Sequence, residues 1–190
     1  MENTVGLSRV TVGYLKKYES ILQTMMHEMA NVPMTCSISD NYIQQMLPHH
    51  LAAIDMSENI LRLTTNLDVQ DLALCIVKEQ KEIIEKMKAN QQKCRLFQNS
   101  PYEVYDYKYG FIEIAEVLFY EMCSMPISNS VNVNYLQEMM LHYHGGLQLA
   151  QNLLRFCICQ ELIPVLQLMI QTQYEHIEWM YKLLDGIGDC

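Results

Sequence analysis

The sequence predicts an all-helical protein, a bundle built from two tandem repeats of three helices each. Three observations support this fold class. Half of the 190 residues are hydrophobic, which is enough to bury a sizeable core. Only seven glycines and five prolines are present, few for a sheet protein with many turns. Matching residues recur at an offset of 93 positions, and such self-similarity is the signature of an internal repeat.

The repeat is clearest in two segments that begin at Asn41 and Asn134. They read NYIQQMLPHHLAAIDMSENILR and NYLQEMMLHYHGGLQLAQNLLR, and eight of the 22 columns are identical. Without a gap, the same offset places Gln80 over Gln173 and Met87 over Met180. A shared register in separate segments predicts a duplication. We expect residues 1–98 and 99–190 to form the two repeats and to share one compact bundle.

Three helices are expected in the first repeat. The first spans about residues 8–30 and ends before Pro33. The second spans about 40–63, with Ser39 and Asp40 as candidate N-caps. The third spans about 69–97, where apolar residues follow helical spacing from Val69 to Met87.

The second repeat gives helices at about residues 105–120, 132–156 and 163–184. Pro164 suits the first turn of the last one, where a missing N–H costs little. Four tyrosines, Tyr102, Tyr105, Tyr107 and Tyr109, are interpreted as a tyrosine-rich linker that packs on the bundle. Because the connections are short, successive helices are expected to be antiparallel neighbours.

Charge and composition exclude several classes of function. The formal net charge of −9 argues against nucleic-acid binding, which depends on clustered Lys and Arg. No apolar run is long enough to span a membrane. Residues 1–17 lack a secretory signal, which predicts a cytoplasmic protein unless such a segment has been removed.

Seven cysteines without a C-x-x-C pair, Cys190 among them, are interpreted as free thiols. Self-association into a homo-oligomer stays open.

Methionine and histidine share one face of the second helix. Met46 lies three and four residues before His49 and His50, the spacings at which helical side chains meet. Thioether sulfur favours soft ions such as copper(I), so this stripe is a candidate metal site. Met139 and His142 keep the spacing in the second repeat, whereas Tyr143 replaces the second histidine there and His144 points about 200° away from His142.

Two glutamines on otherwise apolar helix faces are candidates to orient the histidines. Gln80 and Gln173 each need a hydrogen-bond partner if they are buried, and a histidine of the neighbouring helix is the obvious one. The competing interpretation is structural, because inward methionines and histidines often do no more than fill a core and hydrogen-bond within it.

The second helix also resembles a known family. The residues Tyr42, Met46, Pro48, His49, His50, Ala53, Ile54, Met56 and Ser57 resemble the motif of the bacterial ferritin-like family called "domain of unknown function 305". Gln80, Glu82 and Met87 resemble the next helix of that family. The resemblance implies a ferritin-like bundle, and some members are associated with copper or silver binding.

The resemblance implies a set of candidate metal ligands. In the first repeat these are Met46, His49, His50, Met56 and Met87. In the second repeat only Met139, His142 and Met180 match, since Leu141 stands in place of Pro48 and Leu149 in place of Met56.

Three functions follow as hypotheses. The leading one is a non-catalytic metal-binding bundle that prefers copper(I) or a similar soft ion. The first alternative is a structural or protein-interaction bundle with hydrogen-bonded core histidines and no metal. The second alternative is a ferritin-like metal-dependent oxidoreductase, although the Glu-x-x-His pairs of a di-iron bundle are not present in the sequence.

Overall fold

A computed structural model describes residues 6–188, and its regular structure in that range is entirely helical. The all-α fold class is therefore confirmed. Six long helices and one 3-10 turn follow one another along the chain: α1 (Arg9–Ala30), α2 (Ile38–Leu61), α3 (Leu67–Leu96), α4 (Pro101–Ser124), α5 (Val131–Leu153), η1 (Gln160–Leu162) and α6 (Ile163–Gly188).

Side-chain caps define where the first five helices begin. In each, a Ser or Asn side chain accepts the backbone N–H three residues later, which satisfies one of the unpaired amides of the first turn. These caps are Ser8, Ser37, Asn66, Ser100 and Ser130. In the first turn of α4, Glu103 also bonds back to Ser100 and completes a capping box.

Two predictions about helix ends are wrong. Ser37 caps α2, so Ser39 and Asp40 lie inside its first turn and are buried there. The tyrosine run is not a linker, because α4 starts at Pro101 and continues to Ser124 instead of spanning 105–120. The proline and the capping box at its start outweigh the poor helix propensity of tyrosine. The predicted end at Ala30 and the predicted start at Ile163 coincide with the structure, and the other predicted ends differ from it by one to four residues.

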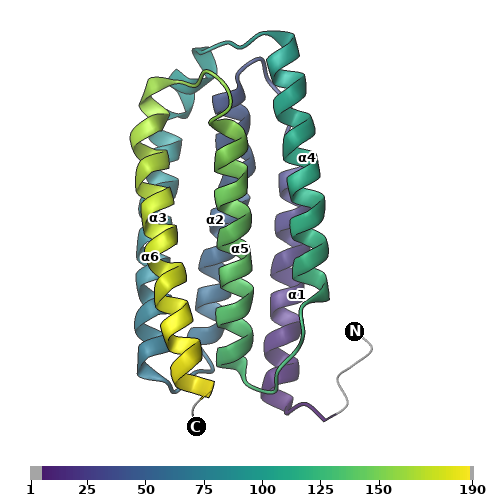
Figure 1. Cartoon of the computed structure of the whole chain (residues 1–190), viewed down its shortest axis with the longest axis vertical. Helices are drawn as coiled ribbons and strands as arrows, with labels where there is room; N and C mark the ends of the chain where they lie inside the picture. The colour runs from purple at the N-terminus through teal and green to yellow at the C-terminus, as the bar shows by residue number, and fades with distance from the viewer. Residues whose placement is uncertain (1–5, 189–190) are drawn as a thin grey trace.

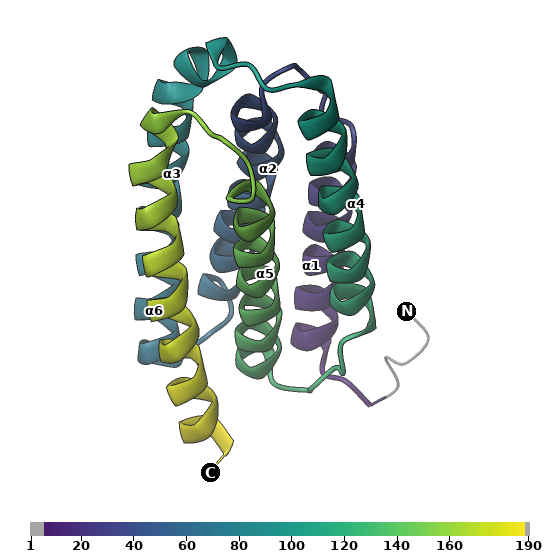
Figure 2. The ribbon, with the colours of Figure 1, turned by 45° about the horizontal axis from the view of Figure 1, so that its top comes forward.

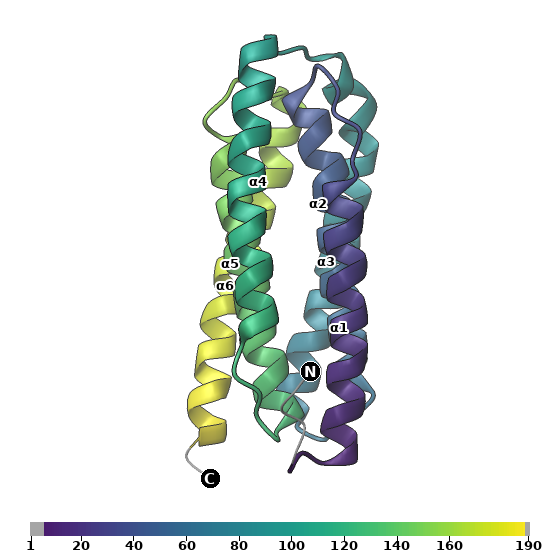
Figure 3. The ribbon, with the colours of Figure 1, turned by 90° about the vertical axis from the view of Figure 1, so that its right-hand side faces the viewer.

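The helices form two layers of three. Figure 3 shows α1, α2 and α3 on one side and α4, α5 and α6 on the other. The central helices α2 and α5 pack against each other, and α3 packs against α6. Figures 1 and 2 show that consecutive helices run in opposite directions. Both central helices are therefore surrounded by neighbours, which explains why most of their residues are buried.

The offset of 93 recurs in the three-dimensional contacts. The Asn59 side chain donates to the carbonyl of Tyr14 at 3.2 Å, and the Asn152 side chain donates to the carbonyl of Tyr107 at 3.0 Å. Both central helices also begin 93 residues apart, at Ile38 and Val131. These two contacts and the two helix starts keep the sequence offset of 93. Within residues 6–188, no helix combines the length and hydrophobicity that a membrane crossing requires.

Candidate metal centre

The two central helices bring their histidines together in the middle of the bundle. His49 on α2 stacks on His142 on α5, with ring centroids 3.8 Å apart and ring planes inclined by 20°. These two residues are equivalent in the repeats. His50 lies beside His49 in an edge-on arrangement, with centroids 5.8 Å apart. All three side chains are fully buried. We call His49, His50 and His142 the imidazole cluster.

Burial keeps the imidazole cluster neutral. Desolvation lowers the pKa of His50 to about 4 and that of His142 to about 3, because a charged ring loses its hydration in the core. Desolvation also lowers the pKa of His49, and the adjacent His142 adds to this effect. At neutral pH each ring therefore carries one N–H group and one nitrogen lone pair.

Most polar atoms of the cluster have no hydrogen-bond partner among residues 6–188. Both ring nitrogens of His49, both of His142 and Nε2 of His50 are buried and unpartnered. The amide of Gln173 is also buried, and neither its nitrogen nor its oxygen is bonded. An unpaired buried polar group costs about 1–3 kcal/mol. Such a concentration of unsatisfied donors and acceptors at one point is unusual for a core.

A hydrogen-bonded chain fixes the orientation of His50. Its Nδ1 donates to the side-chain oxygen of Gln80 at 2.5 Å, and the Gln80 amide nitrogen donates to the Tyr143 hydroxyl at 3.2 Å. That hydroxyl lies 3.3 Å from Nδ1 of His176 on α6. Because the amide oxygen can only accept, the proton of neutral His50 sits on Nδ1. The lone pair of His50 therefore lies on the unpartnered Nε2.

The two glutamines behave differently. Gln80 bonds a histidine of the neighbouring helix, as predicted, whereas Gln173 has no such bond within the described residues. The Gln173 amide instead lies beside Gly146. A Cβ atom added at Gly146 would come within 3.2 Å of that amide and within 3.0 Å of Cε1 of His49. The missing side chain at Gly146 therefore makes room for both groups.

The candidate methionines are distributed along the bundle. All five are buried: Met46, Met56, Met87, Met139 and Met180. Because neighbouring helices are antiparallel, Met46 and Met87 lie on one side of the stacked rings and the other three lie on the opposite side. At 1.5 Å per residue, Met87 and Met180 are about 20 Å apart along the axis. The eight predicted ligands cannot all surround one ion, and among them only the rings of the imidazole cluster are neighbours, with His49 stacked on His142 and edge-on to His50.

Sequence reasoning missed three features of this centre. The stacking of His49 on His142 depends on how the repeats pack, and the sequence does not specify that. In the sequence, Tyr143 stands out only as the replacement of a histidine. His176 occupies the position of Ile83 in the first repeat, so a comparison of the repeats passes over it. His144 is exposed, as its helical position predicts.

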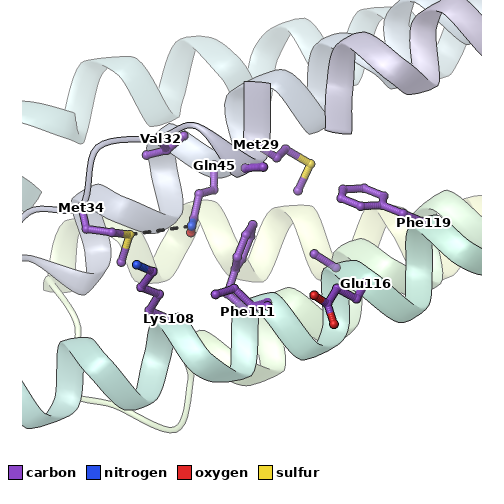
Figure 4. Close-up of a pocket in the computed structure, with 11 residues that line it drawn as sticks. Met29, Val32, Met34, Gln45, Lys108, Phe111, Glu116 and Phe119 are labelled. Atoms are coloured by element: carbon purple, nitrogen blue, oxygen red, sulfur yellow. Dashed lines mark hydrogen bonds between the residues drawn. The ribbon is translucent and has the colours of Figure 1, made fainter. Parts of the chain in front are cut away.

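A separate cavity of about 350 Å³ lies between α1 and α4. Figure 4 shows that it is lined by methionine and phenylalanine side chains, with Gln45 and Lys108 at one end. Gln45 accepts a hydrogen bond from the hydroxyl of Tyr107 at 2.6 Å. None of the three cluster histidines lines this cavity.

Comparison with known proteins agrees with the motif on α2. The family model described as "Domain of unknown function (DUF305)" matches residues 20–101. Residues 20–101 of the chain are therefore similar to a DUF305 domain. A crystal structure of a DUF305 fragment from Deinococcus radiodurans is similar to this chain, with a TM-score of 0.57 and 21% sequence identity. The match covers 81% of this chain and 99% of that fragment. At this identity the similarity demonstrates the fold alone. No curated protein matches the sequence.

Proposed function

We propose that this protein is a non-catalytic metal-binding bundle that holds a soft ion of the copper(I) class at the imidazole cluster. One observation carries the proposal. Five nitrogen atoms of three buried, neutral imidazoles on the two central helices have no hydrogen-bond partner among residues 6–188, although no set of one nitrogen from each ring lies within 4.8 Å of one another. Neutral imidazole is a strong ligand for transition metals, and a bound ion would compensate the unsatisfied lone pairs.

The surrounding groups fit a soft ion. The thioethers of Met46 and Met139 lie one helical turn from the imidazoles, on opposite sides, and thioether sulfur favours copper(I). The hydrogen bond to Gln80 keeps the proton of His50 on Nδ1 and leaves Nε2 free to bind an ion. Metal-binding histidines commonly have such a partner at the second ring nitrogen. The rings of His49 and His142 are stacked and nearly parallel. Their nitrogen lone pairs lie in the ring planes and so do not point at one common position. A shared ion therefore requires one ring to turn about its Cβ–Cγ bond.

The two alternatives have less support. A di-iron type of oxidoreductase needs carboxylates that face the histidines. The buried carboxylate on α5, that of Glu138, instead accepts a hydrogen bond from Tyr14 on α1. A purely structural role would leave several buried donors and acceptors unsatisfied at the cluster, which is costly.

The test is a titration of chelator-treated protein with copper(I) against a competing chelator, under reducing conditions without oxygen. We expect one tightly bound ion per chain. The double variant His49→Ala and His142→Ala should lose at least 100-fold in affinity, because it removes two ligands. Bound copper(I) should also raise the melting temperature, since a ligand present at 100 times its Kd adds about 2.7 kcal/mol of stability.

Matched controls separate metal binding from folding. The exposed His144→Ala variant should bind copper(I) like the wild type. If the double histidine variant does not fold, Met46→Leu with Met139→Leu keeps the core volume and removes both thioethers; it should bind copper(I) at least tenfold more weakly. Binding that is unchanged in the histidine and methionine variants, or no binding at all, contradicts the proposal.

A further inference from the structure

A second group of potential ligands lies at the contact between α3 and α6. Cys75 and Glu79 are one helical turn apart on α3, so their side chains share one face. His176 reaches the same place from α6. One ligand atom of each residue lies within 4.8 Å of the other two. We call these residues the Cys–Glu–His cluster. Gln80 and Tyr143 separate it from His50, so it is distinct from the imidazole cluster.

The ligand atoms are close to the spacing of a metal site. Nε2 of His176 is 3.2 Å from a carboxylate oxygen of Glu79, and the Cys75 thiol donates to the other oxygen at 3.5 Å. A tetrahedral ion with bonds of about 2.0–2.3 Å separates its ligand atoms by about 3.3–3.8 Å. The oxygen that faces His176 is buried and makes no aligned hydrogen bond within the described residues. The two atoms therefore face each other without a proton well placed between them.

The geometry points to a site for a borderline divalent ion of the zinc class, bound by Cys75 sulfur, Glu79 oxygen and His176 nitrogen. Thiolate, carboxylate and imidazole are the ligand types that zinc takes in proteins. One thiolate and one carboxylate balance the charge of the ion. Soft copper(I), proposed above for the imidazole cluster, gains less from the carboxylate.

The surroundings of the cluster suit such an ion. His176 is 4% exposed, and its second ring nitrogen lies 3.3 Å from the Tyr143 hydroxyl. A partner of this kind orients the ring and is usual for metal-binding histidines. The Glu79 side chain is 30% exposed, which provides an entry path from solvent. Three protein ligands leave a fourth tetrahedral position for a water molecule.

Binding has a defined proton balance. The Cys75 thiol loses its proton to solvent when sulfur binds the ion, because only the thiolate is a ligand. Glu79 contributes an ionised carboxylate, and His176 contributes the lone pair of a neutral ring. One proton is therefore released for each ion bound at neutral pH. The step needs no oxidant or reductant.

The experiment titrates chelator-treated protein with zinc against a competing chelator and counts the released protons in weak buffer. We expect one zinc and one proton per chain at this site. Cobalt(II), used as a coloured substitute for zinc, should give a thiolate-to-cobalt charge-transfer band. Cys75→Ser and His176→Gln should each weaken zinc binding at least tenfold. Cys75→Ser should also abolish the cobalt band and the proton release.

Two controls make the result specific. Cys123→Ser alters an exposed thiol on α4 and should leave zinc binding and the cobalt band unchanged. The double variant His49→Ala and His142→Ala should also keep this zinc site, so the two sites can fail independently. If His176→Gln does not fold, the half-buried Cys75 still provides the test. Zinc affinity that Cys75→Ser does not change, or a cobalt complex without a thiolate band, overturns the inference.

Discussion

At the scale of single residues, the two repeats differ at one buried acid. Tyr14 donates to Glu138, whereas the equivalent Tyr107 donates to Gln45. Each bond crosses from one repeat to the other. Desolvation raises the pKa of Glu138 to about 8, and the bond from Tyr14 lowers it only in part. The carboxyl is therefore protonated at neutral pH and resembles the glutamine of the first repeat.

This raised pKa predicts a pH-dependent stability. The unfolded pKa of Glu is about 4.3, so between about pH 4.3 and 8 the folded state holds one proton more than the unfolded state. Stability from this group then falls as the pH rises, by about 1.4 kcal/mol per pH unit. From pH 6.5 to 8 we expect the wild type to lose about 2 kcal/mol, measured as the free energy of unfolding in urea. Glu138→Gln should remove this loss.

Two comparisons test that assignment. The exposed Glu85→Gln variant should keep the slope of the wild type. Gln45→Glu places a second acid in the equivalent environment beside Tyr107 and should steepen the slope. A slope that Glu138→Gln leaves in place would assign the pH dependence to another group.

At the scale of helices, the sequence predicted nearly all of the secondary structure. The amphipathic pattern is local information, and together with the offset of 93 it located all six helices. The prediction failed at two helix starts, where one capping side chain decides the boundary. Ser37 and Ser100 compete with neighbouring polar residues that look equally suitable in the sequence. Which candidate caps the helix depends on packing.

The close packing of α4 on α5 gives a prediction about glycine. Gly145 stands where the first repeat has Ala52, and a Cβ atom added there would overlap the Leu118 side chain of α4. Gly145→Ala forces Leu118 to move and should lower the free energy of unfolding by about 1–3 kcal/mol. Gly13→Ala is the matched control, because no heavy atom lies within 4 Å of that added Cβ. It should raise stability by about 0.5–1 kcal/mol. If both substitutions change the free energy of unfolding equally, helix propensity and not packing sets the stability at both positions.

At the scale of the whole molecule, the candidate centre is created by the packing of one repeat on the other. The sequence identified His49, His50 and His142 as candidates. It could not show that His49 and His142 stack, because their contact is set by the antiparallel pairing of α2 and α5. The Cys–Glu–His cluster was missed for the same reason. Its third member comes from α6 and has no counterpart in the first repeat.

The three neutral histidines at the centre predict that acid destabilises the whole bundle. Their folded pKa values are lowered, whereas an unfolded histidine titrates near 6.5. Below about pH 6.5 the unfolded state therefore binds more protons than the folded state, and stability falls as the pH falls. Glu138 acts in the opposite direction and cancels one of the three protons. For chelator-treated protein we expect a loss of about 3 kcal/mol per pH unit between about pH 4 and 6.5.

The measurement is the free energy of unfolding in urea at several pH values across this range. His142→Gln removes one titrating group, so its slope should be smaller than that of the wild type by about 1.4 kcal/mol per pH unit. His144→Gln changes the exposed histidine two residues further on α5 and should keep the original slope. If both variants show the same slope, protonation of the imidazole cluster does not drive acid unfolding. Acid stability would then be set by groups outside the contact between α2 and α5.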